Sequence, residues 1–140
     1  MAGSDRARAL STARLIAAVL GASPLLLAAV ARLLPSGEGG SWLVVPAGVL
    51  GLAAPAVAWR LQARVRETAT GGADAGRRAY LRSVVVGLAV TEGTALLGVM
   101  AWLLSGEVPA LIGLPMHLLM VGALWPTEER LQRAEEDASR

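Results

Sequence analysis

The run VVVGLAVTEGTALLGVMAWLL spans residues 84–104 and contains a single ionisable side chain, Glu92. A bilayer core of about 30 Å requires about 20 apolar residues in a helix, so this run predicts a transmembrane helix. An ionised side chain at the bilayer centre costs roughly 2.5–3.5 kcal/mol on insertion scales, and carboxylates at that depth commonly mark functional sites. We therefore take Glu92 as the first candidate for function.

The composition and the other apolar runs indicate an all-α integral membrane protein. The chain has 140 residues, of which 54% are hydrophobic, more than is usual for a soluble domain. We expect a single membrane domain, 1–140, with four transmembrane helices at about 14–34, 42–59, 83–104 and 109–125. The polar connector 60–82 has a Gly-rich middle, 70–76, that we expect to be flexible. The polar C-terminal tail 126–140 predicts a solvated helix capped by Thr127, with a partner contact through Leu131 as the alternative.

The first apolar run also has the features of a secretory signal peptide, namely a basic start followed by an apolar, Ala-rich segment. The run is longer than the usual apolar core of a signal peptide, so we expect a retained first helix, with cleavage as the alternative. Pro24 lies in its middle and predicts a kink, because proline leaves one helical carbonyl without its partner.

Arginines distinguish the two ends of the predicted helices. They are concentrated before the first helix and in the connector, whereas the two short turns carry Glu38 and Glu107. The positive-inside rule then places both termini and the connector in the cytoplasm, which gives two tandem hairpins. The aromatic side chains fall at the predicted membrane interfaces: Trp42, Trp59, Tyr80, Trp102 and Trp125. The absence of Lys, Asn and Phe suggests a GC-rich genome, and we expect a bacterial inner or plasma membrane.

The two halves of the chain share a pattern. Leu33-Leu34 followed by Ser36-Gly37-Glu38 matches Leu103-Leu104 followed by Ser105-Gly106-Glu107. Continuing forward, Pro46 falls on Pro115. The match favours an internal duplication in which only the second copy carries ionisable groups inside the membrane. Chance alignment of simple apolar segments is the alternative.

Two ionisable groups fall at similar depth, Glu92 and His117. Counted from the turn between their helices at about 1.5 Å per residue, their depths differ by about 5 Å. Three interpretations of Glu92 remain open: it binds a proton or cation, it packs helices as a neutral hydrogen-bonded group, or it contacts another subunit. His117 is either a packed interior histidine or the partner of Glu92. Thr91 and Thr94 are candidate donors to Glu92, although helical threonines commonly bond their own backbone.

Small residues predict where helices approach closely. They are frequent in the second apolar run and recur in the third, and the candidates for helix packing are Gly48, Gly51, Ala54 and Gly98.

Residues 48–104 also resemble the proteolipid (the ring-forming c subunit) of rotary ATPases. In that family a Glu is followed about six positions later by Gly, as Glu92 is by Gly98, and the preceding helix is rich in small residues, as around Gly48 and Gly51. Arg60–Arg64 is similar to the short Arg/Gln loop of the family, although the whole connector is longer. The resemblance implies that Glu92 binds H⁺ or Na⁺ within a ring of subunits.

The residue types that are absent from the sequence exclude several classes of function. The chain has no cysteine and one histidine, so thiol chemistry and Cys/His metal sites are excluded. We find no nucleophile motif or phosphate-binding loop and expect neither an enzyme, nor a cofactor, nor a metal. The arginines mark membrane ends, so we expect no nucleic acid among the partners.

We predict a subunit or scaffold of a larger membrane complex. Its expected partners are the lipid bilayer and other membrane subunits or further copies of itself. The first alternative is a proteolipid-like protein that uses Glu92 in ion translocation. A small proton-coupled transporter is the weaker alternative.

Overall fold

The computed structural model describes residues 2–35, 37, 39–67 and 71–139, and this part of the chain is helical without strands. Three helices are long: α1 (Ala2–Ala31), α2 (Val44–Glu67) and α3 (Ala73–Ser105). Two are shorter: α4 (Gly113–Leu124) and α5 (Glu128–Asp137). Short 3-10 segments, η1 (Ser41–Leu43) and η2 (Val108–Ile112), precede α2 and α4.

Three segments are long and apolar enough to cross a bilayer: Ser4–Ala31 in α1, Ser41–Glu67 in η1 and α2, and Ala73–Ser105 in α3. A fourth span results if Val108–Leu124 is counted together with α5, which is bent away from it by 68°. Length and composition therefore confirm the prediction of an all-α protein whose helices are able to span a membrane.

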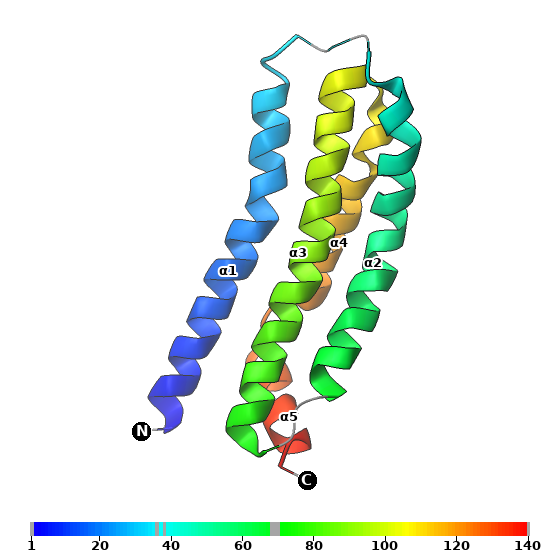
Figure 1. Cartoon of the computed structure of the whole chain (residues 1–140). Helices are drawn as coiled ribbons and strands as arrows, with labels where there is room; N and C mark the ends of the chain where they lie inside the picture. Colours follow the sequence, from blue (N-terminus) through cyan, green and yellow to red (C-terminus); the bar gives the residue numbers. More distant parts are fainter. Residues whose placement is uncertain (1, 36, 38, 68–70, 140) are drawn as a thin grey trace.

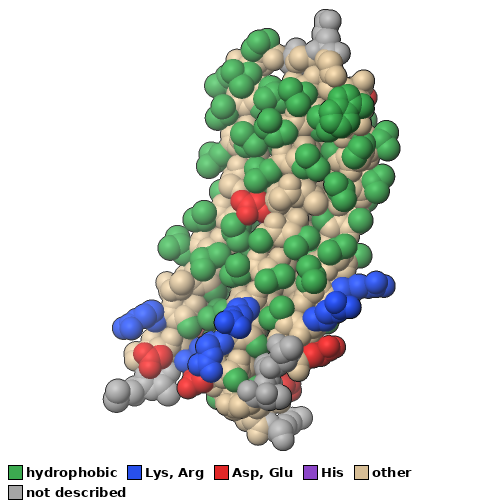
Figure 2. All heavy atoms as spheres, viewed as in Figure 1, with side chains coloured by type: hydrophobic (Ala, Val, Ile, Leu, Met, Phe, Trp, Pro, Cys, Tyr) green, Lys and Arg blue, Asp and Glu red, His purple; other side chains and the backbone are tan. Residues whose placement is uncertain are grey.

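The surface agrees with a membrane environment. In Figure 2 the arginines lie toward one end of the face shown, below a broad area of hydrophobic side chains. Large apolar side chains are exposed along the helices, for example Leu26 at 66%, Val45 at 71% and Val49 at 61%. Soluble monomers rarely expose contiguous apolar surface on this scale, whereas lipid tails would cover it.

The helices extend well beyond the apolar runs. α1 begins at Ala2 rather than near residue 14, and α2 and α3 together take up most of the 60–82 connector. Ala and Arg are among the best helix formers, so the polar ends continue the helices. The expectation of a flexible 70–76 loop is wrong for 73–76, which belong to α3, while residue 70 lies outside the described residues. The turn before α3 contains Gly71 and Gly72, whose φ angles of +120° and +87° favour glycine.

The predicted helix 109–125 consists of two parts, η2 and α4. Pro115 has no N–H to bond the Leu111 carbonyl four residues earlier, which fits the change from 3-10 to α-helical bonding at Gly113. Pro126 lies two residues beyond the end of α4 and disfavours helical backbone at Trp125, so the helix stops and α5 leaves in a new direction.

α3 lies at the centre of the bundle, with α1 and α2 on its two sides, and both termini lie at the same end (Figure 1). We expected 14–34 and 42–59 to form one of two tandem hairpins; in the structure α1 and α2 each pack on α3, and the loop between them crosses the end of α3. In that loop the Gly37 N–H donates to the Leu103 carbonyl at 3.0 Å, and the Gly40 N–H donates to the Leu104 carbonyl at 3.1 Å. These bonds attach the loop to the end of α3.

Glycine allows backbones to touch around α3. A Cβ on Gly98 would lie 2.5 Å from the Ala110 carbonyl oxygen, and a Cβ on Gly51 would lie 2.8 Å from the Gly113 Cα. Both obstacles are backbone atoms, so α2, α3 and the start of α4 approach this closely only because these side chains are absent.

α5 is not the solvated tail that its composition predicts. The Thr127 hydroxyl accepts from the Arg130 N–H at 3.4 Å, which confirms the capping prediction. However, Leu131 is completely buried in the core of the same chain. A Cβ on Gly76 would lie 2.2 Å from the Ala134 carbonyl oxygen, so α5 packs directly on the backbone of α3. The fold thus closes one end of the bundle with its own C-terminal helix.

Candidate functional site

His117 on α4 is completely buried and joins three helices. Its Nδ1 lies 2.8 Å from Thr91 Oγ1 on α3, and its Nε2 lies 3.1 Å from the Leu20 carbonyl oxygen on α1. A carbonyl oxygen can only accept, so Nε2 carries a hydrogen and donates it to Leu20. We call Leu20, Ser23, Thr91, Glu92 and His117 the mid-bundle cluster.

The Leu20 carbonyl needs this donor because of Pro24. In an α-helix the carbonyl of residue 20 accepts from the N–H of residue 24, and proline has none. Pro24 is fully buried, and a backbone carbonyl left unpaired in an apolar environment costs several kcal/mol. The His117 N–H replaces the missing bond. Pro24 in α1 therefore leaves the Leu20 carbonyl open, and His117 in α4 supplies the N–H that bonds it.

The Thr91 hydroxyl suits either protonation state of His117. With the neutral ring protonated on Nε2, Nδ1 accepts the single hydrogen of Thr91 Oγ1. The same oxygen lies 3.1 Å from the Leu88 carbonyl and 3.3 Å from the Gly87 carbonyl. It would donate to one of these if Nδ1 carried a hydrogen, so this contact persists in both states.

Glu92 is bonded to α1 rather than to His117. Its Oε1 accepts a hydrogen bond from the Ser23 hydroxyl, and its side chain is half-buried. Ser23 Oγ also lies 3.4 Å from the Leu20 carbonyl oxygen. Among the described residues no hydrogen bond joins Glu92 to His117, so the two groups are linked through α1.

The expected threonine donors to Glu92 take other roles. Thr94 Oγ1 donates to the Thr91 carbonyl of its own helix at 2.9 Å, and Thr91 Oγ1 bonds His117. Ser23 is the residue that the sequence analysis missed. A signal was present, because Ser23 is the single polar side chain in residues 15–31 and directly precedes Pro24.

The candidate packing glycines of α2 and α3 lie against η2 and the start of α4. Gly51, Ala54 and Gly98 are buried, whereas Gly48 is half-buried. A Cβ on Gly48 would meet only the Ile112 side chain, at 3.9 Å. Gly51 and Gly98 therefore mark backbone contacts, and Gly48 lies at the edge of the packed region.

The predicted interfacial aromatics divide into two groups. Trp42, Trp59 and Trp125 are exposed, and Trp102 is half-buried. Tyr80 is instead buried in the core, with the Arg66 guanidinium 6.0 Å from its ring centroid. The docking of α5 explains this difference, since α5 covers the part of α3 that carries Tyr80.

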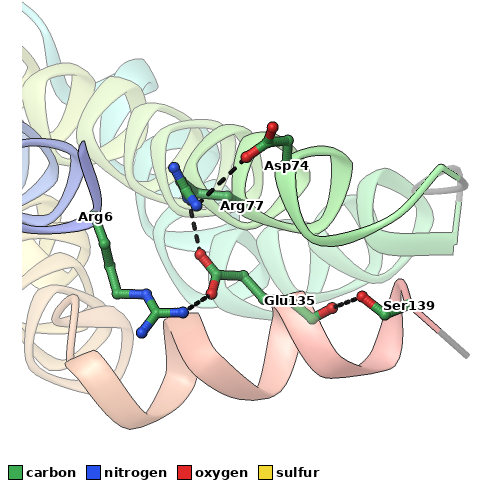
Figure 3. Close-up of polar contacts among 5 residues, drawn as sticks. All are labelled: Arg6, Asp74, Arg77, Glu135 and Ser139. Atoms are coloured by element: carbon green, nitrogen blue, oxygen red, sulfur yellow. Dashed lines mark hydrogen bonds and ion pairs between the residues drawn. The ribbon is translucent and has the colours of Figure 1, made fainter. Parts of the chain in front are cut away.

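Glu135 joins three helices at the end that holds both termini (Figure 3). Its carboxylate accepts from Arg6 on α1 and from Arg77 Nε on α3, the latter at 2.8 Å. Arg77 also lies 3.4 Å from Asp74. Burial raises the pKa of Glu135, but the hydrogen bonds and charges of Arg6 and Arg77 outweigh burial and leave that pKa below its ordinary value.

Glu135 does not stand out in the sequence, because it is one of several charged residues in a polar tail. One feature of the sequence could have identified it: Glu135 lies four residues after Leu131, which places both on one face of α5.

Within the described ranges, no three His, Asp or Glu side chains lie together as a metal site would require. Comparison with models of protein families, with curated proteins and with solved structures finds no match to this chain.

Proposed function

We propose that this chain is a non-enzymatic integral membrane protein, a subunit or scaffold of a larger membrane complex, in which the mid-bundle cluster holds the helices together. The observation that supports this most directly is that Glu92 and His117 both find partners on other helices of their own chain. Polar contacts of this kind between membrane helices contribute about 0.6–2 kcal/mol each, so the cluster is suited to fixing α1 against α3 and α4.

The surface supports a role in assembly. Exposed apolar side chains on α1 and α2 form a surface that lipid tails or the helices of a partner can cover. Both termini and the arginine-rich ends of α2 and α3 lie at one end of the bundle, which by the positive-inside rule we assign to the cytoplasm. The membrane that fits the composition is a bacterial inner or plasma membrane.

A second candidate function, proton binding at Glu92, is favoured by the Ser23 contact. If Glu92 is ionised, Ser23 donates its one hydrogen to the carboxylate. If Glu92 is protonated, it can donate to Ser23 Oγ, and Ser23 can then donate to the Leu20 carbonyl 3.4 Å away. The contact thus accommodates both states, as an exchangeable proton site requires. The similarity to the proteolipid carboxylate helix points in the same direction.

Carbodiimide labelling of native membranes distinguishes the two functions, because carbodiimides modify accessible protonated carboxyls. Under the scaffold proposal we expect no labelling of Glu92 at any pH, and Glu92→Gln should leave association with partners intact. Labelling of Glu92 that persists at neutral pH and disappears at alkaline pH would refute the scaffold proposal in favour of proton binding. Glu107→Gln is the control, because it removes an exposed carboxylate at a turn and should leave the labelling of Glu92 unchanged.

A further inference from the structure

A cavity of about 440 Å³ opens beside α5, between the ends of α2, α3 and α4. It lies where the apolar part of the bundle gives way to the arginine-rich end. Its lining combines three guanidinium groups with aromatic side chains and one carboxylate: Arg66, Arg130, Arg133, Trp59, Tyr80 and Asp137.

Arg66 and Arg130 are each held beside the cavity by a hydrogen bond, and each keeps N–H donors that could bind an anion. Arg66 Nε donates to Ser83 Oγ at 3.2 Å, and among the described residues no carboxylate lies within ion-pair distance of Arg66. Arg130 uses one nitrogen, Nη1, to donate to the carbonyls of Ala123 and Trp125. Each guanidinium has five N–H donors, so most of them remain for a ligand.

Arg133 is also available. The nearest carboxylate, that of Glu129, lies 3.9 Å away, and the two side chains are 76% and 83% exposed. Water screens a pair of this kind, so Glu129 competes weakly for the guanidinium. Asp137 is the one carboxylate of the lining, which leaves a surplus of positive charge in the cavity.

We propose that this cavity binds the phosphate group of an anionic phospholipid. Guanidinium groups form paired, charge-assisted hydrogen bonds with phosphate oxygens. Basic pockets between membrane helices near the water interface are suited to lipid headgroups. The apolar walls favour a lipid over a free anion: Trp59 is 65% exposed beside the cavity, and Ala123 and Leu124 at the end of the apolar α4 also line it. This inference holds whichever function the mid-bundle cluster serves.

The test measures the thermal stability of the purified full-length chain in an uncharged detergent. The additions are phosphatidylglycerol, phosphatidylcholine or inorganic phosphate, each at the same concentration. A ligand that binds only the folded state raises Tm by mass action. We expect phosphatidylglycerol to raise Tm by about 5 °C and the other two additions to have little effect.

The variants locate the site. Arg133→Gln should remove at least half of the rise in Tm caused by phosphatidylglycerol, and because Arg133 is exposed its loss should leave folding unaffected. Arg64→Gln is the matched control, since Arg64 is an exposed arginine of α2 outside the lining, and it should keep the full rise. Equal effects of phosphatidylcholine, or equal losses in the two variants, would overturn the proposal. A rise with inorganic phosphate as large as that with phosphatidylglycerol would overturn the assignment to a lipid.

Discussion

Replacing Glu135 with Gln tests whether one carboxylate fastens α1 and α5 to the end of α3. Its side chain is 5% exposed and contacts Arg77, whose side chain is 18% exposed, and Arg6, which is 37% exposed. The Ser139 hydroxyl also donates to the Glu135 backbone carbonyl at 2.7 Å, a bond that the substitution leaves unchanged (Figure 3).

The magnitude follows from these exposures. A hydrogen bond to a charged group contributes about 1.5–3 kcal/mol. The Arg6 contact counts for less, because more than a third of that side chain is in water, which screens the charge. Gln keeps one acceptor oxygen and loses the charge. We therefore expect Glu135→Gln to lower the free energy of unfolding by about 2 kcal/mol near neutral pH.

The pH dependence provides a second measurement of the same contact. The pKa of Glu135 is lower in the folded chain than its ordinary value of 4.5, because Arg6 and Arg77 stabilise the ionised form. A carboxyl with a depressed pKa contributes stability above its unfolded pKa and loses that stability as the pH falls through its folded pKa. The difference between wild type and Glu135→Gln should therefore be full near pH 7 and shrink below about pH 4.5.

The assay is equilibrium unfolding in mixed micelles titrated with SDS, from pH 7 to pH 3. Glu136→Gln is the matched control, because Glu136 is the next residue of α5 and is exposed. Equal stability of the two variants at pH 7 would refute the reasoning. So would a difference from wild type that stays constant down to pH 3.

Three further predictions concern the contacts between helices. His117→Phe should lower the free energy of unfolding by about 2 kcal/mol, and Pro24→Ala should reduce that loss by restoring a helical N–H to the freed carbonyl. A double-mutant cycle measures this coupling, and strictly additive effects would contradict it. Gly51→Ala should lower Tm because its Cβ meets backbone at 2.8 Å, whereas Gly48→Ala, with its nearest neighbour at 3.9 Å, should leave Tm nearly unchanged. Gly76→Ala should release α5, which limited proteolysis would detect as faster C-terminal cleavage; unchanged cleavage would mean that α5 does not dock as described.

The spans could be predicted from the sequence, but their arrangement could not. Bilayer thickness sets the length of an apolar run, so residues 84–104 could be recognised without neighbours. Nothing comparable sets which helices touch, because the four runs have similar composition. The short polar stretch after α1 suggested an adjacent helix. Residues 32–40 can nevertheless reach about 30 Å when extended, which is enough to cross the end of α3.

The ionisable residues of the candidate site could also be predicted from the sequence, but their partners could not. Glu92 and His117 could be selected because ionisable groups inside apolar runs are costly. Their partners depend on how the helices are rotated about their axes, and one partner is a backbone carbonyl with no side-chain signal. Only the combination of Pro24 with a distant donor would have identified the Leu20 carbonyl. The burial of Leu131 was missed because a single Leu in a charged segment carries little weight before the packing of α5 is known.

The bond between Leu20 and His117 has a consequence for the order in which the chain matures. The two residues are 97 positions apart, so α1 leaves the ribosome long before the donor for its open carbonyl has been synthesised. Until then, the donors within reach are water and the Ser23 hydroxyl of the same helix, 3.4 Å away, since lipid offers no donor. α1 thus reaches its final set of contacts only after α4 has been made. A nascent chain stopped before α4 would leave this carbonyl with only the long Ser23 contact, a weakness that a quality-control protease can recognise.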